Sequence, residues 1–208
     1  MISNGHLRRL SVLSLVLLAL AAGAAERAHG DAEGCPAYPV ERHFLPWLDV
    51  MNYTLAPNGG LEEGAAGWAL SGGAAVVAGN ESFFVRDRAD QSSLYLPSGS
   101  SASTGATCVE LLEGTMRFFV KNTGSLLSTL QVEVLYRDAL GKQRAHTVGL
   151  LIAGQRWQPT LPVVFLANLT HPPLVTDGTV DVAFRFTPRG LGGRWSVDDV
   201  FVDPFKGT

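Results

Sequence analysis

Arg194-Trp195-Ser196-Val197-Asp198-Asp199-Val200-Phe201-Val202 is an apolar, β-branched run near the C-terminal end of the chain, and its composition predicts a strand. Two adjacent carboxylates, Asp198 and Asp199, lie inside this run. Asp is disfavoured within strands, and a buried carboxylate is costly unless it is paired or holds a metal. We therefore expect a compensating partner for at least one of the two carboxylates.

Similar short runs recur through the chain, separated by Gly, Ser, Asn and Pro. Apolar and polar residues alternate most clearly in 129–137 and 179–187, which indicates strands with one packed face and one wet face. The candidate strands are 68–71, 74–78, 82–86, 92–96, 107–111, 115–122, 128–138, 143–151, 163–166, 179–188 and 194–202. Their spacing of roughly ten residues predicts an all-β, antiparallel β-sandwich of eight or more strands.

Three connecting segments carry turn chemistry. Residues 138–142 predict a hairpin loop between two strands. Residues 97–106 are rich in Ser, Gly and Thr and predict a solvated loop, whereas 168–178 contain Pro172-Pro173 and cannot be a central strand. No repeat and no long linker interrupts the pattern, so we expect one domain.

The N-terminus predicts export. Arg8 and Arg9 precede an apolar stretch over 10–20, and Ala22-Gly23-Ala24 supplies a small-x-small cleavage pattern. The apolar stretch is shorter than the roughly 20 residues that span a bilayer. We therefore expect a cleaved signal peptide over 1–24, an N-terminal arm over 25–56, a sandwich domain over 57–208, and a secreted, extracellular product.

Charge and cysteine content narrow the partners and the compartment. The net charge of −3 falls to about −5 once the two signal arginines are removed, which disfavours nucleic acid and anionic membranes. No basic run or amphipathic helix suggests membrane insertion, and we expect a monomer. The two cysteines, Cys35 and Cys108, predict a disulfide that fastens the arm to the sandwich, with two buried thiols as the alternative.

Two motifs carry a resemblance to a known family. The opening Asn58-Gly59-Gly60-Leu61-Glu62-Glu63-Gly64 with Trp68, and the closing Val197-Asp198-Asp199-Val200, resemble the two ends of carbohydrate-binding modules. The resemblance covers 57–204 and implies a galactose-binding-like jelly-roll fold. The chain as a whole also looks like secreted bacterial proteins in which an arm, here 44–49, precedes such a module.

The resemblance also implies a structural calcium ion. Its ligands would be Glu62 and one of Asp198 and Asp199, with Asp198 slightly favoured from strand alternation unless a bulge reverses the choice. Two alternatives need no metal. An arginine could pair with the carboxylate, or the carboxylate could cap turn amides. The candidate arginines are Arg86, Arg88, Arg117, Arg185 and Arg194.

Sugar recognition requires an aromatic face for the ring C–H groups and planar polar groups for the hydroxyls. Trp68, Trp195 and Tyr136 fit the core better than a binding site. Trp157, near a strand end, is the freer aromatic candidate. Arg117 and Arg185 lie on polar strand faces and could bind a ligand, although a solvated or ion-paired sheet face is the more ordinary explanation for both. An exposed Trp47 or Tyr53 in a cleft would also qualify.

Catalysis has little support from the sequence. His43, His146 and His171 are isolated, and no zinc-binding or nucleophile-elbow motif occurs. No spacing among the glutamates selects a glycosidase pair. We expect a non-catalytic carbohydrate-binding module. The alternative is an extracellular or envelope-associated structural sandwich with no sugar ligand, because fold alone does not decide function.

Overall fold

The computed structural model describes residues 35–203 with the exception of 37, 111–113, 139 and 166–178. The predicted signal peptide over 1–24 and the predicted irregular segment over 168–178 lie outside the described residues. In the described part of the chain, no helix has the length and apolar character needed to cross a membrane. Its one short helical element is the 3-10 turn η1 (Leu45–Trp47) in the arm.

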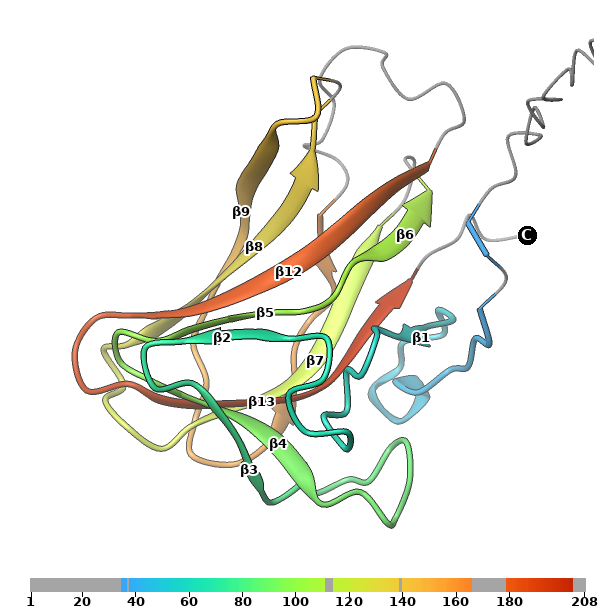
Figure 1. Cartoon of the computed structure of the whole chain (residues 1–208). Helices are drawn as coiled ribbons and strands as arrows, with labels where there is room; N and C mark the ends of the chain where they lie inside the picture. The colour runs from blue at the N-terminus through green and yellow to red at the C-terminus, as the bar shows by residue number, and fades with distance from the viewer. Residues whose placement is uncertain (1–34, 37, 111–113, 139, 166–178, 204–208) are drawn as a thin grey trace, which may run out of the picture. The chain divides into compact units, whose positions relative to one another are not determined.

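Two antiparallel sheets form a jelly-roll β-sandwich, as predicted (Figure 1). The seven-stranded sheet has the order β10-β7-β13-β4-β3, with β1 beside β13 and β11 beside β7. Its strands are β1 (Thr54–Leu55), β3 (Ala75–Ala78), β4 (Ser92–Pro97), β7 (Thr115–Asn122), β10 (Gln158–Pro159), β11 (Val163–Val164) and β13 (Arg194–Asp203).

The six-stranded sheet has the order β2-β5-β12-β8-β9, with β6 beside β12. Its strands are β2 (Ala69–Ser71), β5 (Ser101–Ser103), β6 (Thr107–Glu110), β8 (Thr129–Arg137), β9 (Gln143–Leu151) and β12 (Thr179–Arg189). Between β8 and β9, the amide of Asp138 donates to the carbonyl of Lys142 over 2.9 Å, as expected for the predicted hairpin.

Strand alternation builds the core between the sheets. In β12, Val182, Phe184 and Phe186 are fully buried, while the intervening Ala183 and Arg185 face outward. Trp68 and Trp195 join this core, which confirms their assignment as core residues. Two aromatic pairs lock the layers together, with ring centroids 5.1 Å apart for Phe118–Phe186 and 4.9 Å apart for Phe165–Phe184.

The opening motif works as a turn organised by Asn58. Its side-chain amide donates to the carbonyls of Gly64 and Ala66, both over 2.9 Å, and its backbone carbonyl accepts from the indole of Trp68 over 3.0 Å. Asn58 itself adopts a positive φ of 48°, a conformation that Asn tolerates better than most residues. The motif therefore sets the approach of Trp68 to the core.

The closing strand contains a β-bulge between Asp198 and Phe201. Asp199 lies in this bulge with a φ of 46°. The bulge interrupts the alternation of β13. Val197 and Val200 would face opposite sides of a regular strand, but here both side chains lie in the core. Asp198 and Asp199 consequently point to different surroundings, both fully buried.

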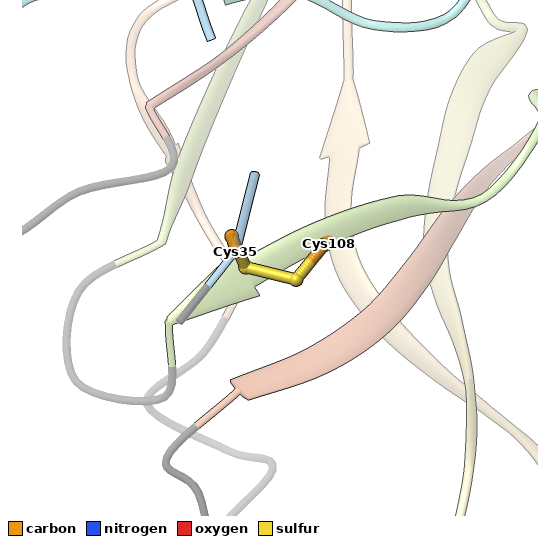
Figure 2. The surroundings of a disulfide bond; sticks show 2 residues. All are labelled: Cys35 and Cys108. Atoms are coloured by element: carbon orange, nitrogen blue, oxygen red, sulfur yellow. A yellow bond between two sulfur atoms is a disulfide. The ribbon is translucent and has the colours of Figure 1, made fainter. Parts of the chain in front are cut away.

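The predicted disulfide is present. Cys35 of the arm is bonded to Cys108 of β6, with the two Cα atoms 5.4 Å apart (Figure 2). The bond ties the start of the described chain to the six-stranded sheet. An oxidised cysteine pair is typical of proteins outside the cytoplasm.

Two sequence-based expectations are corrected. Residues 82–86 form turns rather than a strand, because the side chain of Glu81 captures the amides of Phe83 and Val85 that a ladder would require. The expected loop over 97–106 contains the strand β5, because Ala102 is fully buried in the core and its neighbours pair with β2 and β12.

Candidate functional site

The arm lies across the outer face of the seven-stranded sheet, beside β13 in Figure 1. Phe44 and Tyr53 of the arm pack on Phe119 of β7 and Phe201 of β13, and all four side chains are fully buried. The Phe44 ring centroid is 5.6 Å from that of Phe119 and 5.5 Å from that of Phe201. These contacts form a second apolar cluster outside the main core.

Arg117 fastens the arm to this face. Its guanidinium donates to Asp49 over 2.6 Å and to the carbonyl of Thr160 over 2.6 and 2.9 Å, and it lies 4.2 Å from the centre of the Phe44 ring. Burial acts to raise the pKa of Asp49, but hydrogen bonds from the Met51 amide and Arg117 hold it below its ordinary value. Arg117 is thus buried and committed to the arm.

The loop over 79–91 lies beside the arm and depends on buried carboxylates. The amide of Gly79 donates to the carbonyl of Gln91 over 2.7 Å and closes the base of the loop. Asp198 accepts the amide of Glu81 over 2.8 Å, and the Glu81 carboxylate accepts the amides of Phe83 and Val85. The loop is therefore anchored to β13 through Asp198.

Burial has a large effect on the two acids of the closing strand. Desolvation, together with the charge of Asp199, raises the pKa of Asp198 to about 9. Desolvation also raises the pKa of Asp199 to about 7, against the opposing effect of Arg86. Burial thus favours the protonated form of Asp198, while its two oxygens accept the amides of Glu81 and Asp199 and make it a hydrogen-bonding anchor.

A groove of about 670 Å³ lies between the arm and the 79–91 loop, and we call it the arm groove. Trp47, which is half-buried, meets the ring of Phe83 edge-on with centroids 5.0 Å apart. His43 stacks on Phe201 at 4.2 Å, and burial lowers the pKa of His43. The groove is lined by Glu41, Arg42, His43, Leu45, Pro46, Trp47, Phe83 and Val85.

Among the described residues, no segment covers the outer face of the six-stranded sheet, which carries polar side chains. Arg185 of β12 donates to Glu133 of β8 over 2.8 Å, and Gln131 of β8 bonds both Arg189 and Thr147. Two hollows of about 350 and 270 Å³ lie on this face. Since these polar groups already satisfy one another, a ligand would have to compete with existing hydrogen bonds.

The three ligand-binding candidates from the sequence do not come together. Arg117 is buried beneath the arm, and Arg185 lies on the outer face of the other sheet. Trp157 packs against the second apolar cluster with the Lys121 ammonium 4.3 Å above its ring. Tyr53 is fully buried, so Trp47 is the aromatic candidate that lines a groove.

The opening turn and the closing strand approach each other around Arg86. Glu62 accepts the amides of Gln91 and Ser92 over 2.9 and 2.8 Å. Arg86 pairs with Asp90 over 2.6 Å and lies 3.7 Å from Asp199. Asp199 lies in the bulge, and the negative charge of Glu62 contributes to raising its pKa.

The fit of this site to calcium can be judged from its oxygens. Both carboxylate oxygens of Asp199 are buried and accept no hydrogen bond from the described residues. A bound cation would compensate such unpaired oxygens, because calcium is coordinated by carboxylate oxygens. However, no cluster of three or more His, Cys, Asp or Glu side chains suited to a metal occurs among the described residues. The nearest cation to Asp199 in this structure is Arg86.

Sequence reasoning missed the arm groove residues Arg42, Phe83 and Val85. A usable signal existed in the doublet Phe83-Phe84, since two adjacent aromatic residues cannot both face one side of a strand. Both rings are in fact exposed, at 46% and 44%. Exposed aromatic side chains beside a concave surface are typical of binding sites.

Comparisons with known proteins concern the fold. No protein-family model and no curated protein sequence matches the chain. Among solved structures, the chain is similar to a family 22 xylan-binding domain from Paenibacillus barcinonensis Xyn10C, at 17% identity and a TM-score of 0.46, covering 68% of this chain and 88% of that one. It is also similar to the second family 16 carbohydrate-binding module, at 16% identity and a TM-score of 0.49, covering 72% and 99%.

A third similar structure is the TmCBM61 module in complex with β-1,4-galactotriose, at 17% identity and a TM-score of 0.43, covering 74% and 98%. The chain spans only 27% of a longer Clostridium thermocellum xylanase 10B structure that contains a family 22 module and a GH10 module. At these identities and TM-scores, the similarities carry no argument about the ligand.

Proposed function

We propose that this protein is a secreted, non-catalytic carbohydrate-binding protein that holds a glycan in the arm groove. The observation that carries the proposal is the pairing of aromatic and planar polar groups in one concavity. Trp47 and Phe83 offer apolar ring surface, and Glu41 and Arg42 offer planar acceptors and donors at the same groove. A pyranose presents C–H groups on its faces and hydroxyls at its edge, so it matches both kinds of surface.

Two further features support the proposal. The arm groove is held in shape before any ligand arrives, because Arg117 and the Cys35–Cys108 bond fasten the arm while Asp198 fastens the 79–91 loop. Preorganisation lowers the entropic cost of binding. The disulfide and the predicted signal peptide support a role outside the cytoplasm.

The test is Trp47→Ala against the matched control Trp157→Ala, which removes an aromatic residue outside the groove. Binding of a panel of polysaccharides and oligosaccharides, including xylohexaose and β-1,4-galactotriose, is measured by affinity electrophoresis and calorimetry. We expect Trp47→Ala to weaken binding of the best ligand about tenfold or more, about 1.4 kcal/mol. Since Trp47 and Trp157 both pack against the second apolar cluster, the control variant also accounts for lost packing. Trp157→Ala should bind like the wild type.

Two outcomes would contradict the proposal. Equal loss in both variants would place the ligand elsewhere. Absence of binding to every glycan by a correctly folded protein would favour the second candidate function, an extracellular structural sandwich without a sugar ligand.

We also propose a structural calcium ion at Asp199, with Glu62 in its surroundings. The two buried oxygens of Asp199 without hydrogen-bond donors support it, and Arg86 is the competing partner. Calcium at a hundredfold excess over its Kd would stabilise the fold by about 2.7 kcal/mol. The melting temperature should then rise with calcium and fall with chelator in the wild type, and less so in Glu62→Gln and Asp199→Asn. An unchanged wild-type midpoint would assign the compensating role to Arg86.

A further inference from the structure

A different part of the molecule carries exposed aliphatic side chains on loop tips. The loops that follow β7, β9 and β12 meet at one end of the sandwich, opposite the β8–β9 hairpin (Figure 1). Hydrogen bonds join them, since the amide of Ser125 donates to the carbonyl of Gly192 and the amide of Asn122 donates to the carbonyl of Gly154, both over 2.8 Å. These three loops therefore form one surface, which we call the loop-tip surface.

Aliphatic side chains protrude from each of the three loops. Leu126 and Leu127 are 71% and 92% exposed, Ile152 is 76% exposed and Leu191 is 89% exposed. Single exposed leucines are ordinary on a protein surface, but four strongly exposed aliphatic residues on loops bonded to one another are not. None of the four packs into the cores described above, so folding does not explain them.

The charges of the same loops have one sign. Arg156, Arg189 and Arg194 are exposed, and the segments 122–128, 151–157 and 189–194 contain no Asp or Glu. The protein as a whole has a net charge of −3, so its basic residues are unevenly distributed and this end is locally positive. A positive local field attracts an anionic surface even when the net charge is negative.

We propose that the loop-tip surface docks on an anionic lipid surface, with the aliphatic tips inserted at the interface and the arginines at the headgroups. Separate protruding side chains suit insertion into a fluid interface, whereas a protein partner of standard size requires a broader complementary face. Basic residues beside inserted apolar groups gain from negatively charged headgroups. This peripheral contact departs from the expectation drawn from net charge, because that expectation ignored where the charges lie.

The arm groove and the loop-tip surface consist of different residues, so glycan binding and lipid docking can be tested separately. The full exported protein with its disulfide is mixed with phosphatidylcholine vesicles, with and without about 30 mol% phosphatidylglycerol, and bound protein is measured by co-flotation. We expect binding to the anionic vesicles that weakens as salt increases, because screening reduces the arginine contribution.

Two variants and a control identify the contacts. Leu127→Ser with Leu191→Ser should weaken vesicle binding at least about tenfold, because two inserted side chains are lost. Arg156→Gln with Arg194→Gln should weaken it several-fold and flatten its salt dependence. Leu140→Ser is the matched control, since Leu140 is 90% exposed in the β8–β9 hairpin at the other end. It should bind like the wild type.

The proposal is overturned by any of three results. The first is that the wild type fails to bind anionic vesicles at low salt, which would leave an acidic protein partner as the better occupant. The second is that Leu140→Ser loses as much binding as the leucine double variant. The third is that only the arginine variant loses binding, which would show adsorption by charge without insertion. Trp47→Ala should leave vesicle binding unchanged, so failure of the glycan proposal does not affect this test.

Discussion

The two outer faces of the sandwich differ in what covers them. On the seven-stranded sheet, Phe119 and Phe201 point outward and are nevertheless fully buried, because Phe44 and Tyr53 of the arm lie on them. On the six-stranded sheet, the outward Arg185 keeps 35% of its side chain exposed and pairs with Glu133. One face has become a second small core, and the other remains a conventional wet face.

This difference teaches how a concave site can arise on a sandwich. The outer face of the six-stranded sheet has two smaller hollows, of about 350 and 270 Å³. A segment laid over a face adds a wall, and here an open groove of about 670 Å³ lies between the arm and the 79–91 loop. The candidate binding site therefore depends on how firmly the arm is attached.

The largest expected effect comes from removing the main arm anchor. Phe44→Ala deletes a fully buried ring from the second apolar cluster and should lower the free energy of unfolding by about 3–5 kcal/mol. Urea denaturation measures this loss, and glycan binding in the arm groove should be lost with it. Leu48→Ala is the control, because Leu48 lies in the same arm at 91% exposure and should change stability by less than about 0.5 kcal/mol.

Equal effects of Phe44→Ala and Leu48→Ala would show that the arm does not stabilise the covered face. The burial of Phe119 and Phe201 by the arm would then contribute nothing measurable to the free energy of unfolding. Phe44→Leu provides a second measurement if Phe44→Ala does not fold, and it should fall between the wild type and the alanine variant.

An intermediate effect is expected from pH. In the folded protein the pKa of Asp198 is about 9 and that of Asp199 about 7, above the ordinary value near 4 of the unfolded chain. The folded state therefore holds more protons than the unfolded state between about pH 4 and 9, and stability falls as pH rises through this window. The slope for one such group is at most about 1.4 kcal/mol per pH unit.

Urea denaturation at several pH values with chelator present measures this slope. Asp198→Asn, which resembles the protonated acid, should flatten it. Asp181→Asn on the open face should leave it unchanged, because Asp181 is exposed. Stability that rises with pH across this window, or an unaltered slope in Asp198→Asn, would contradict the assignment of a protonated anchor beneath the 79–91 loop.

The smallest effect is expected on the open face. Arg185→Gln removes a partly exposed ion pair with Glu133 and should cost less than about 1 kcal/mol of stability. It should leave glycan affinity unchanged, as measured on the same panel as Trp47→Ala. A marked loss of glycan binding in Arg185→Gln would move the site from the covered face to the open one.

Several elements were predictable because their pattern is local. The strands β7 and β9 have the bounds that alternation predicted, and Trp68 and Trp195 entered the core from their positions in two apolar motifs. The disulfide followed from two cysteines in a chain with a predicted signal peptide. In each case, the residues within one segment, or a simple count, contained the required information.

The two predictions that failed depend on partners that the local pattern does not show. Residues 82–86 have the composition of a strand, but the Glu81 side chain and the Asp198 anchor hold them in turns. Ser101–Ser103 has the composition of a loop, but Ala102 fits the core and the flanking serines pair with two neighbouring strands. Propensity is overridden where a buried partner is available.

The sequence by itself determined the class of fold, the disulfide and the presence of buried acids in the last strand, because periodicity, cysteine number and the cost of burying charge are properties of the chain. Only the tertiary structure decided that Arg117 and Arg185 lie on opposite faces, that Asp199 in the bulge lies beside Arg86, and that Trp47 meets Phe83 across a groove. Each of these depends on which sheet a strand joins and on what covers its outer face. Neither property is encoded in the alternation of a single strand, which distinguishes two sides without saying which partner each side will meet.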